Sequence, residues 1–195
     1  SDHEVNLKIC LQPVVASGAL GAEERNGLLA AVDDDVVLRV LDHNRRQSRL
    51  LGADQVRSRT ALVDFVALMT ELERFAGLDR ALAALPDREA LRRRRSEFLG
   101  LTRPELASLM AHAKLHLQGA LLASDLPDDA ILEPYLTDYF PSRVGARYPE
   151  AVRRHRLRRE IIATEAANAL VDELGITFVH RVARGAAVQP TDVVR

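Results

Sequence analysis

The chain has 195 residues, enough for one domain with a buried core, and its 27 basic and 28 acidic residues nearly cancel. No global positive field therefore attracts nucleic acid or a membrane surface. Hydrophobic residues make up 47% and aromatic residues only 4%, with no Trp, while Ala and Leu are abundant; this balance favours packed helices over a sheet. No apolar run approaches the roughly 18 residues that a membrane span needs.

A single cysteine, Cys10, excludes an internal disulfide bond and is typical of proteins in a reducing cytosol. The first residues, SDHEVNLKIC, are charged where a secretory signal peptide would be apolar. We therefore expect a cytoplasmic protein. Because the chain starts without Met and in the middle of a pattern, we also expect it to be a fragment of a longer polypeptide.

The first quarter of the chain predicts two helices. Asp2–Val15 reads as a helix, although the local alternation of apolar residues is also compatible with a strand. Apolar residues at helical spacing predict a second helix over Ala22–Leu51, which the acidic triplet Asp33–Asp35 is expected to break into two pieces. The polar run Gly52–Arg59 predicts a connector.

The next stretch predicts three further helices. Thr60–Phe75 has one apolar face and predicts a helix that ends at Gly77. A short helix is expected over Asp79–Leu85. Asp87–Phe98 predicts a polar helix, which carries the consecutive arginines Arg92–Arg95.

Thr102 begins a helix with strong local signals. Thr102 and Glu105 fit a capping box, and Pro104 suits the first turn. The face predicted to be buried consists of Leu106, Leu109, Met110, Ala113, Leu117 and Leu121. Further along, a short helix is expected over Ala130–Thr137, followed by an aromatic-lined turn over Pro141–Arg147.

The segment Arg147–Leu174 predicts one long helix that begins near Pro149 and ends at Gly175. Its first half carries five arginines within Arg153–Arg159, and its second half is apolar on most sides. Because the helix dipole disfavours cations near an N-terminus, we expect these arginines to have anionic partners, in this chain, in a neighbouring subunit or in nucleic acid. The near-zero net charge and the lack of aromatic residues for stacking favour protein carboxylates over nucleic acid. The acidic candidates within the chain are Asp33, Asp34, Asp35, Asp125, Asp128, Asp129 and Asp138.

Isolated residues are weak candidates for chemistry. His112 and His116 have the spacing at which two imidazoles share a zinc ion, but no third ligand follows, and two histidines on a helix surface are the commoner arrangement. Cys10 has no positioned base and is expected to be a small buried hydrophobe. Asn168 is expected to be a hydrogen-bonded core residue. The scattered glycines form no phosphate-binding loop.

Longer phrases of the sequence resemble one family. These phrases are SDHEVNLKICLQPVV at the start, GLTRPELASLMAHAKLHLQGALLASDLPDD in the middle, and DYFPSRVGARYPEAVRRHRLRREIIAT and ANALVDELGITFVHR near the end. They are similar to the very large bacterial NAD-specific glutamate dehydrogenases, and the similarity covers essentially the whole chain in order. It implies the C-terminal part of a multidomain enzyme that oxidises L-glutamate to 2-oxoglutarate and ammonium, with NAD bound upstream.

The same resemblance divides the chain. Residues 1–55 would be tail helices of the catalytic, dinucleotide-binding domain, and residues 56–195 would be a helical C-terminal domain that stops before further helices of the family. Ser1 resembles the serine whose hydroxyl helps to bind the side-chain carboxylate of the substrate. The resemblance implies no catalytic, cofactor-binding or metal-binding residue within the chain.

These observations predict an all-α chain, an irregular bundle of many helices. It would help to assemble and brace a homo-oligomeric dehydrogenase, contact the upstream catalytic domain, and be inactive alone. Neither nucleic acid nor a membrane is an expected partner. The alternative is a free-standing helical module that binds protein, or nucleic acid through its arginines.

Overall fold

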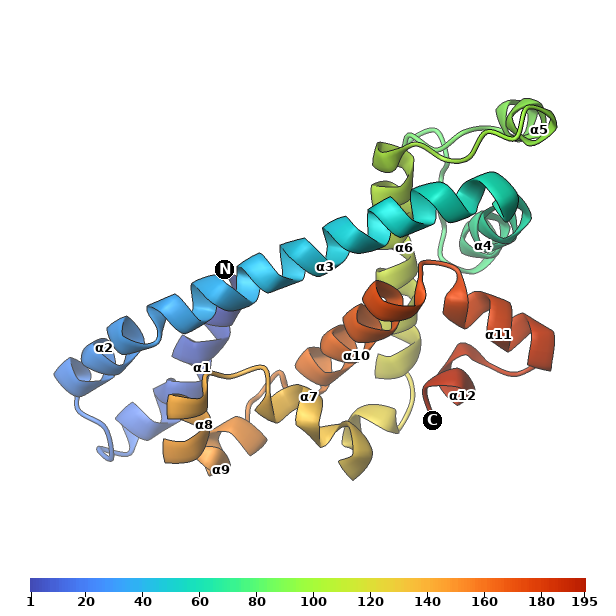
Figure 1. The fold of residues 1–195 in the computed structure, drawn as a ribbon. Helices are drawn as coiled ribbons and strands as arrows, with labels where there is room; N and C mark the ends of the chain where they lie inside the picture. The colour runs from blue at the N-terminus through green and yellow to red at the C-terminus, as the bar shows by residue number, and fades with distance from the viewer. The chain divides into compact units, whose positions relative to one another are not determined.

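A computed structural model describes all 195 residues. It contains twelve α-helices, two short 3-10 helices and no β-strand (Figure 1). The predicted all-α fold class is therefore confirmed. None of the helices is both long and apolar enough to cross a membrane.

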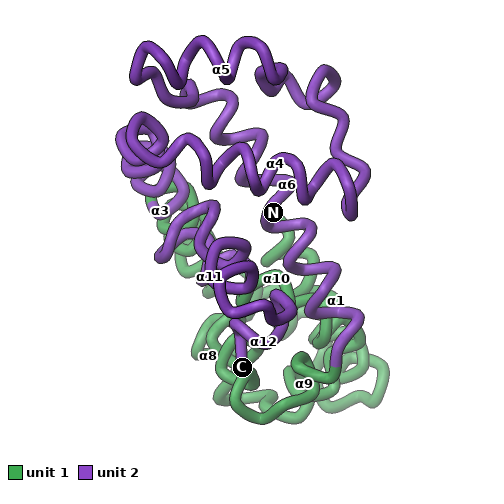
Figure 2. The backbone as a smooth tube through the Cα atoms, turned by 90° about the vertical axis from the view of Figure 1, so that its right-hand side faces the viewer, with its two compact units in different colours: residues 1–45, 125–166 green, residues 46–124, 167–195 purple.

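The chain divides into two compact units, and each unit is assembled from two separate stretches of sequence (Figure 2). Unit 1 contains residues 1–45 and 125–166, and unit 2 contains residues 46–124 and 167–195. Two helices, α3 (Asp33–Thr60) and α10 (Arg158–Leu174), contribute residues to both units. Neither unit is therefore a continuous piece of sequence.

Unit 1 contains α1 (Asp2–Ala16), which packs against α2 (Ala22–Ala31) and α9 (Pro149–Arg153). α1 buries one helical stripe, which consists of His3, Leu7, Cys10 and Leu11. This stripe confirms the helix, rather than the strand, at the start of the chain. The other elements of unit 1 are short: η1 (Leu126–Asp128), η2 (Ala130–Leu132), α7 (Glu133–Thr137) and α8 (Ser142–Arg147).

Unit 2 contains α6 (Arg103–Leu122), which packs against α4 (Leu62–Phe75) and α12 (Pro190–Val194). The predicted capping box at the start of α6 is present, and all six side chains predicted for its inner face are buried. α11 (Phe178–Ala186) packs against α12. α5 (Arg88–Ser96) buries only Leu91.

The second predicted helix is interrupted where expected but is longer than expected. Val32 separates α2 from α3, which begins with the predicted acidic triplet. The prediction of a connector over Gly52–Arg59 is wrong, because α3 continues to Thr60. Asp54 and Ser58, four residues apart, are both buried there, so this polar run carries an inner face that apolar periodicity did not reveal.

Two short segments differ from prediction. The helix predicted over Asp79–Leu85 is a turn, in which the Asp79 carboxylate accepts from the N–H groups of Ala81 (2.8 Å) and Leu82 (3.2 Å). The turn ends at Ala84, which has a left-handed backbone with φ 52°. The turn predicted over Pro141–Arg147 is instead α8, whose backbone enters the helix from Pro141 at φ −53°.

The long helix predicted over Arg147–Leu174 is broken between α9 and α10. The break surrounds His155, which is buried and whose Nδ1 accepts a hydrogen bond from the Leu157 N–H at 3.1 Å. A side chain that competes for backbone donors in this way favours a bend over a continuous helix. The predicted end at Gly175 is confirmed.

Gly175 occupies a turn whose backbone conformation is strained for any residue with a side chain. Its φ is +104°, and a Cβ there would lie 2.8 Å from the guanidinium of Arg57. The same guanidinium donates to Thr177 Oγ1 at 2.9 Å, and the buried Asp54 carboxylate accepts from the Ile176 N–H at 2.9 Å. Polar side chains of α3 thus hold the turn between α10 and α11.

Candidate functional site

Ser1 directly precedes α1 at the N-terminal end of the helix. Its side chain makes no capping hydrogen bond, and the residue is exposed. Its carbonyl accepts from the Val5 N–H at 3.2 Å, which connects its backbone to the first helical turn. The hydroxyl is therefore accessible, and its position depends on how firmly α1 is held.

An aromatic stack holds the first turn of α1. His3 is only 7% exposed, and its ring lies 4.2 Å from the Tyr139 ring at 26°. Burial lowers the pKa of His3, although the nearby Glu165 carboxylate acts in the opposite direction. Burial also raises the pKa of Tyr139 to about 12, so neither ring carries a charge at neutral pH.

A series of hydrogen bonds holds the second turn of α1. The Asn6 amide donates to the Tyr139 hydroxyl at 2.8 Å, and the Asn6 carbonyl lies 3.1 Å from Nε2 of His155. Because Nδ1 of His155 accepts from Leu157, Nε2 must carry the ring proton and donate to Asn6. Burial lowers the pKa of His155, which is consistent with this neutral form.

The segment that carries Tyr139 is itself held by α3. The guanidinium of Arg39 donates to the carbonyls of Asp138 and Phe140, the latter at 3.2 Å. Four residues further along α3, His43 Nε2 lies 3.5 Å from a Glu165 carboxylate oxygen. Unit 1 thus surrounds the N-terminal half of α1 with buried polar and aromatic groups that fix it in place.

Unit 2 contains a second group of titratable side chains, which are partly buried. Glu71 on α4 pairs with His180 on α11, and its other oxygen lies 3.8 Å from His116 Nε2. His112 instead contacts the Ser108 carbonyl through Nδ1 at 2.9 Å, so the two histidines of α6 have different partners. The structure contains no group of three or more His, Cys, Asp or Glu side chains placed to hold a metal ion.

The two arginine groups pair mainly with carboxylates. Arg94 forms a bidentate ion pair with Glu105, in which Nη1 and Nη2 donate to the two carboxylate oxygens at 2.6 and 2.9 Å. Arg93 Nη1 lies 3.9 Å from a carboxylate oxygen of Glu89. In unit 1, Arg158 pairs with Asp128 at 2.7 Å, and Arg159 contacts the same carboxylate. Asp128 is therefore confirmed as one of the predicted partners.

Two other carboxylates were not predicted as partners. Arg153 contacts Glu133 at 3.2 Å and Glu150 at 2.9 Å, and Arg154 lies 3.7 Å from Glu150. Glu150 is three and four residues before these arginines, a spacing at which side chains on a helix meet. The sequence contained this signal within the segment itself.

The remaining single residues have the following places. Cys10 is 2% exposed, as predicted, and burial raises the pKa of its thiol to about 11. Asn168 is half-buried rather than part of the core, so the expectation of a core amide is wrong. The sequence-based reasoning missed His3, Tyr139 and His155. For His3 a signal existed, because it lies four residues before Leu7 on the apolar stripe of α1.

Comparison with known proteins gives matches at both ends of the chain. The family model for "Bacterial NAD-glutamate dehydrogenase, catalytic domain" matches residues 1–54. The family model for "Glutamate dehydrogenase, C-terminal" matches residues 99–195. The two matched regions do not overlap, and the catalytic-domain match precedes the C-terminal match.

Three curated relatives are each named NAD-specific glutamate dehydrogenase. The protein from Mycobacterium tuberculosis is 40% identical over the whole chain, and the one from Halomonas elongata is also 40% identical over the whole chain. The protein from Pseudomonas aeruginosa is 42% identical over 99% of the chain. The chain spans only 12% of the length of each of these relatives.

Proposed function

Because this chain belongs to the family of bacterial NAD-specific glutamate dehydrogenases, we propose that it works as the C-terminal part of such an enzyme. The intact polypeptide would oxidise L-glutamate with NAD and water to 2-oxoglutarate, ammonium and NADH. The observation that carries this proposal is the sequence identity to three relatives of that name, which is 40–42% over 99–100% of the chain.

Within that enzyme, residues 1–55 would be the tail helices of the catalytic domain, and residues 56–195 would form a helical C-terminal domain. The separate family matches to residues 1–54 and 99–195 support this division. NAD would be bound by the catalytic portion upstream. The chain offers only helices and scattered glycines, which do not resemble the strand-to-helix phosphate loop of a dinucleotide site.

The role of the chain would be to assemble and brace the enzyme, as a cytoplasmic homo-oligomer, rather than to carry out chemistry. The contacts around α1 support the bracing role. Tyr139 and His155, which lie far along the chain, hold Asn6 through hydrogen bonds at 2.8 and 3.1 Å, and Tyr139 stacks on His3. A helix anchored in this way would keep the residue at its N-terminal end in a fixed position.

We expect Ser1 to bind the side-chain carboxylate of glutamate in the intact enzyme. Replacing Ser1 by Ala should raise the KM for glutamate about ten-fold or more, because one hydrogen bond to a charged group is lost. Steady-state kinetics on the full polypeptide test this. Ser17→Ala, at the exposed C-terminal end of α1, is the matched control and should leave the KM unchanged.

The wider proposal has a separate test. The full polypeptide encoded by the reading frame should form NADH when glutamate and NAD are supplied together. If it forms none, or if the reading frame starts directly before Ser1, the enzyme proposal is wrong. An unchanged KM in Ser1→Ala, with normal NADH formation, would remove only Ser1 from the site.

A further inference from the structure

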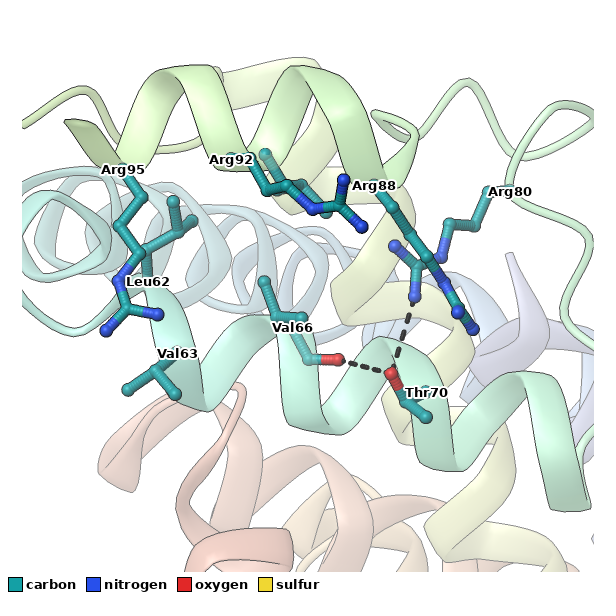
Figure 3. A pocket seen from close by; sticks show the side chains of 9 residues that line it. Leu62, Val63, Val66, Thr70, Arg80, Arg88, Arg92 and Arg95 are labelled. Carbon is teal, nitrogen blue, oxygen red and sulfur yellow. Dashed lines mark hydrogen bonds between the residues drawn. The ribbon is translucent and has the colours of Figure 1, made fainter. Parts of the chain in front are cut away.

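A pocket of about 350 Å³ lies between α4 and α5 in unit 2 (Figure 3). Its volume is within the range of roughly 300–1,000 Å³ that is usual for small-molecule sites. Side chains of α4 form an apolar wall along it, Leu62, Val63 and Val66, and α5 adds Leu91. An apolar wall of this kind suits the hydrocarbon part of a ligand.

Four arginines and no acidic residue line the same pocket. Three of them, Arg88, Arg92 and Arg95, extend from one face of α5 toward α4 (Figure 3). Their spacing places them along about 10 Å of helix. All three residues are exposed and none is paired with a carboxylate, so three positive charges stand in a row without compensation.

The fourth arginine, Arg80, forms a built-in part of the wall. It is only 9% exposed, and it is held by Glu73 through Nε at 2.7 Å and Nη2 at 2.8 Å. Nη2 also lies 3.5 Å from Thr70 Oγ1 (Figure 3). Its third nitrogen, Nη1, is buried and has no hydrogen-bond partner. Leaving a buried donor unpaired is costly, and an anionic oxygen in the pocket would supply the partner.

Three acidic side chains in this region already have partners. Glu73 binds Arg80, the Asp87 carboxylate caps α5 by accepting from the Ala90 N–H at 2.7 Å, and Glu89 pairs with Arg93. Like charges at i, i+3 and i+4 destabilise a helix. The arginine row is therefore a local excess of positive charge that the surrounding chain does not neutralise.

We propose that this pocket binds a small organic dianion, a molecule with an apolar body and two carboxylate or phosphate groups. Its apolar body would lie along Val63 and Val66, and its anionic groups would accept hydrogen bonds from the guanidinium groups of α5. Guanidinium groups are well suited to bind carboxylates and phosphates in this manner. The inference does not depend on the proposed function.

The test uses the full polypeptide and three probes of matched design in calorimetric titrations. Octanedioate has an apolar chain with a carboxylate at each end, octanediol has the same chain without charge, and inorganic phosphate has charge without the chain. Octanedioate should bind at least about ten times more tightly than either of the other two, because only it uses both walls. Added salt should weaken its binding.

Variants distinguish the pocket from a general charge effect. The double change Arg92→Gln and Arg95→Gln should weaken octanedioate binding at least about ten-fold, which is the loss expected when charge-assisted hydrogen bonds are removed. Arg93→Gln is the control: it removes one positive charge from α5 outside the pocket lining and should leave binding unchanged. Val66→Phe should fill the pocket and weaken binding while the arginines remain.

Four results would overturn the proposal. They are no octanedioate binding by the full polypeptide, equal binding of octanediol, equal binding of phosphate, and equal weakening by Arg93→Gln and by the double change. Because Arg92 and Arg95 are exposed, their replacement leaves the buried core intact, and a loss of binding is not a loss of folding.

Discussion

At the scale of single residues, the bend between α9 and α10 depends on one neutral histidine. His155 uses Nδ1 to accept from Leu157 and Nε2 to donate to Asn6, both at 3.1 Å. A proton on Nδ1 would abolish the first bond and leave the Leu157 N–H facing a donor. The folded protein therefore disfavours the charged ring, in agreement with the lowered pKa of His155.

This protonation preference predicts a loss of stability in mild acid. The unfolded chain takes up a proton at His155 near the ordinary pKa of 6.5, whereas the folded chain does so only at lower pH. Stability is then fully present above about pH 6.5 and decreases as the pH falls toward the folded pKa. His3, whose pKa is also lowered, acts in the same direction.

Thermal unfolding followed by circular dichroism measures this effect. The melting temperature should fall between about pH 7.5 and about pH 5.5. His155→Gln should make this fall smaller, because glutamine does not titrate. It should also cost about 1–3 kcal/mol of stability at the higher pH, because it leaves the buried hydrogen bonds at the bend incomplete. An equal fall in both proteins would contradict the assignment of a neutral His155.

At the scale of helices, a buried ion pair joins α6 to α10 within unit 2. Lys114 Nζ lies 2.6 Å from an Asp172 carboxylate oxygen, and the two side chains are 12% and 1% exposed. Burying two charges costs free energy that their attraction repays only while both are present. The pair therefore constrains which residues of α6 and α10 face one another.

Removing one partner of this pair should be severe. Asp172→Asn leaves the Lys114 ammonium buried without its counter-charge and should cost about 3–5 kcal/mol in the free energy of unfolding. The double change Lys114→Met and Asp172→Leu should recover most of that loss. Glu173→Gln, one position away and exposed, should change stability by less than about 0.5 kcal/mol. Similar effects of Asp172→Asn and Glu173→Gln would exclude a role for the pair.

The helices that the sequence predicted well are those with local signals. The capping box and apolar face of α6 are determined within about 20 residues, and both could be located from the sequence. The continuation of α3 past Gly52 and the break at His155 depend on distant partners. Asp54 binds the backbone of Ile176, and His155 binds the backbone of Asn6, so no local pattern contains that information.

At the scale of the whole molecule, charge is balanced locally as well as in total. The net charge is −1, and the arginines of α9 and α10 are matched by Asp128, Glu133 and Glu150. Each arginine paired in this way is less available for a phosphate contact with a nucleic acid. The unpaired arginine row on α5 faces a pocket rather than an extended surface.

Two charge reversals separate structural pairing from nucleic-acid binding. Arg158→Glu should lower the free energy of unfolding by about 1 kcal/mol, because it breaks the pair with Asp128 and adds a like charge. Arg154→Glu should have little effect on stability, because the Arg154 side chain is 84% exposed. Fluorescence anisotropy with duplex DNA at about 0.15 M salt should detect no binding by the unchanged protein. Salt-sensitive DNA binding that both reversals abolish, without loss of stability, would favour the free-standing nucleic-acid-binding module instead.

The site could be predicted from the sequence only in part. The family resemblance assigned Ser1 to binding of the substrate carboxylate, and that assignment stays a prediction. The aromatic and histidine contacts that hold α1 involve residues more than a hundred positions apart, as the Asn6–Tyr139 separation of 133 illustrates. Only the folded chain brings these residues together.

The discontinuous make-up of unit 1 also has a consequence during synthesis on the ribosome. Residues 46–124 must be translated after α1 and before the segments that cover it in unit 1. At about 5–20 residues per second, this leaves the early segment waiting for several seconds or more. The apolar stripe of α1 that includes Leu7 and Leu11 stays uncovered by these segments for that time, which is the interval when a nascent chain depends most on protection by a chaperone.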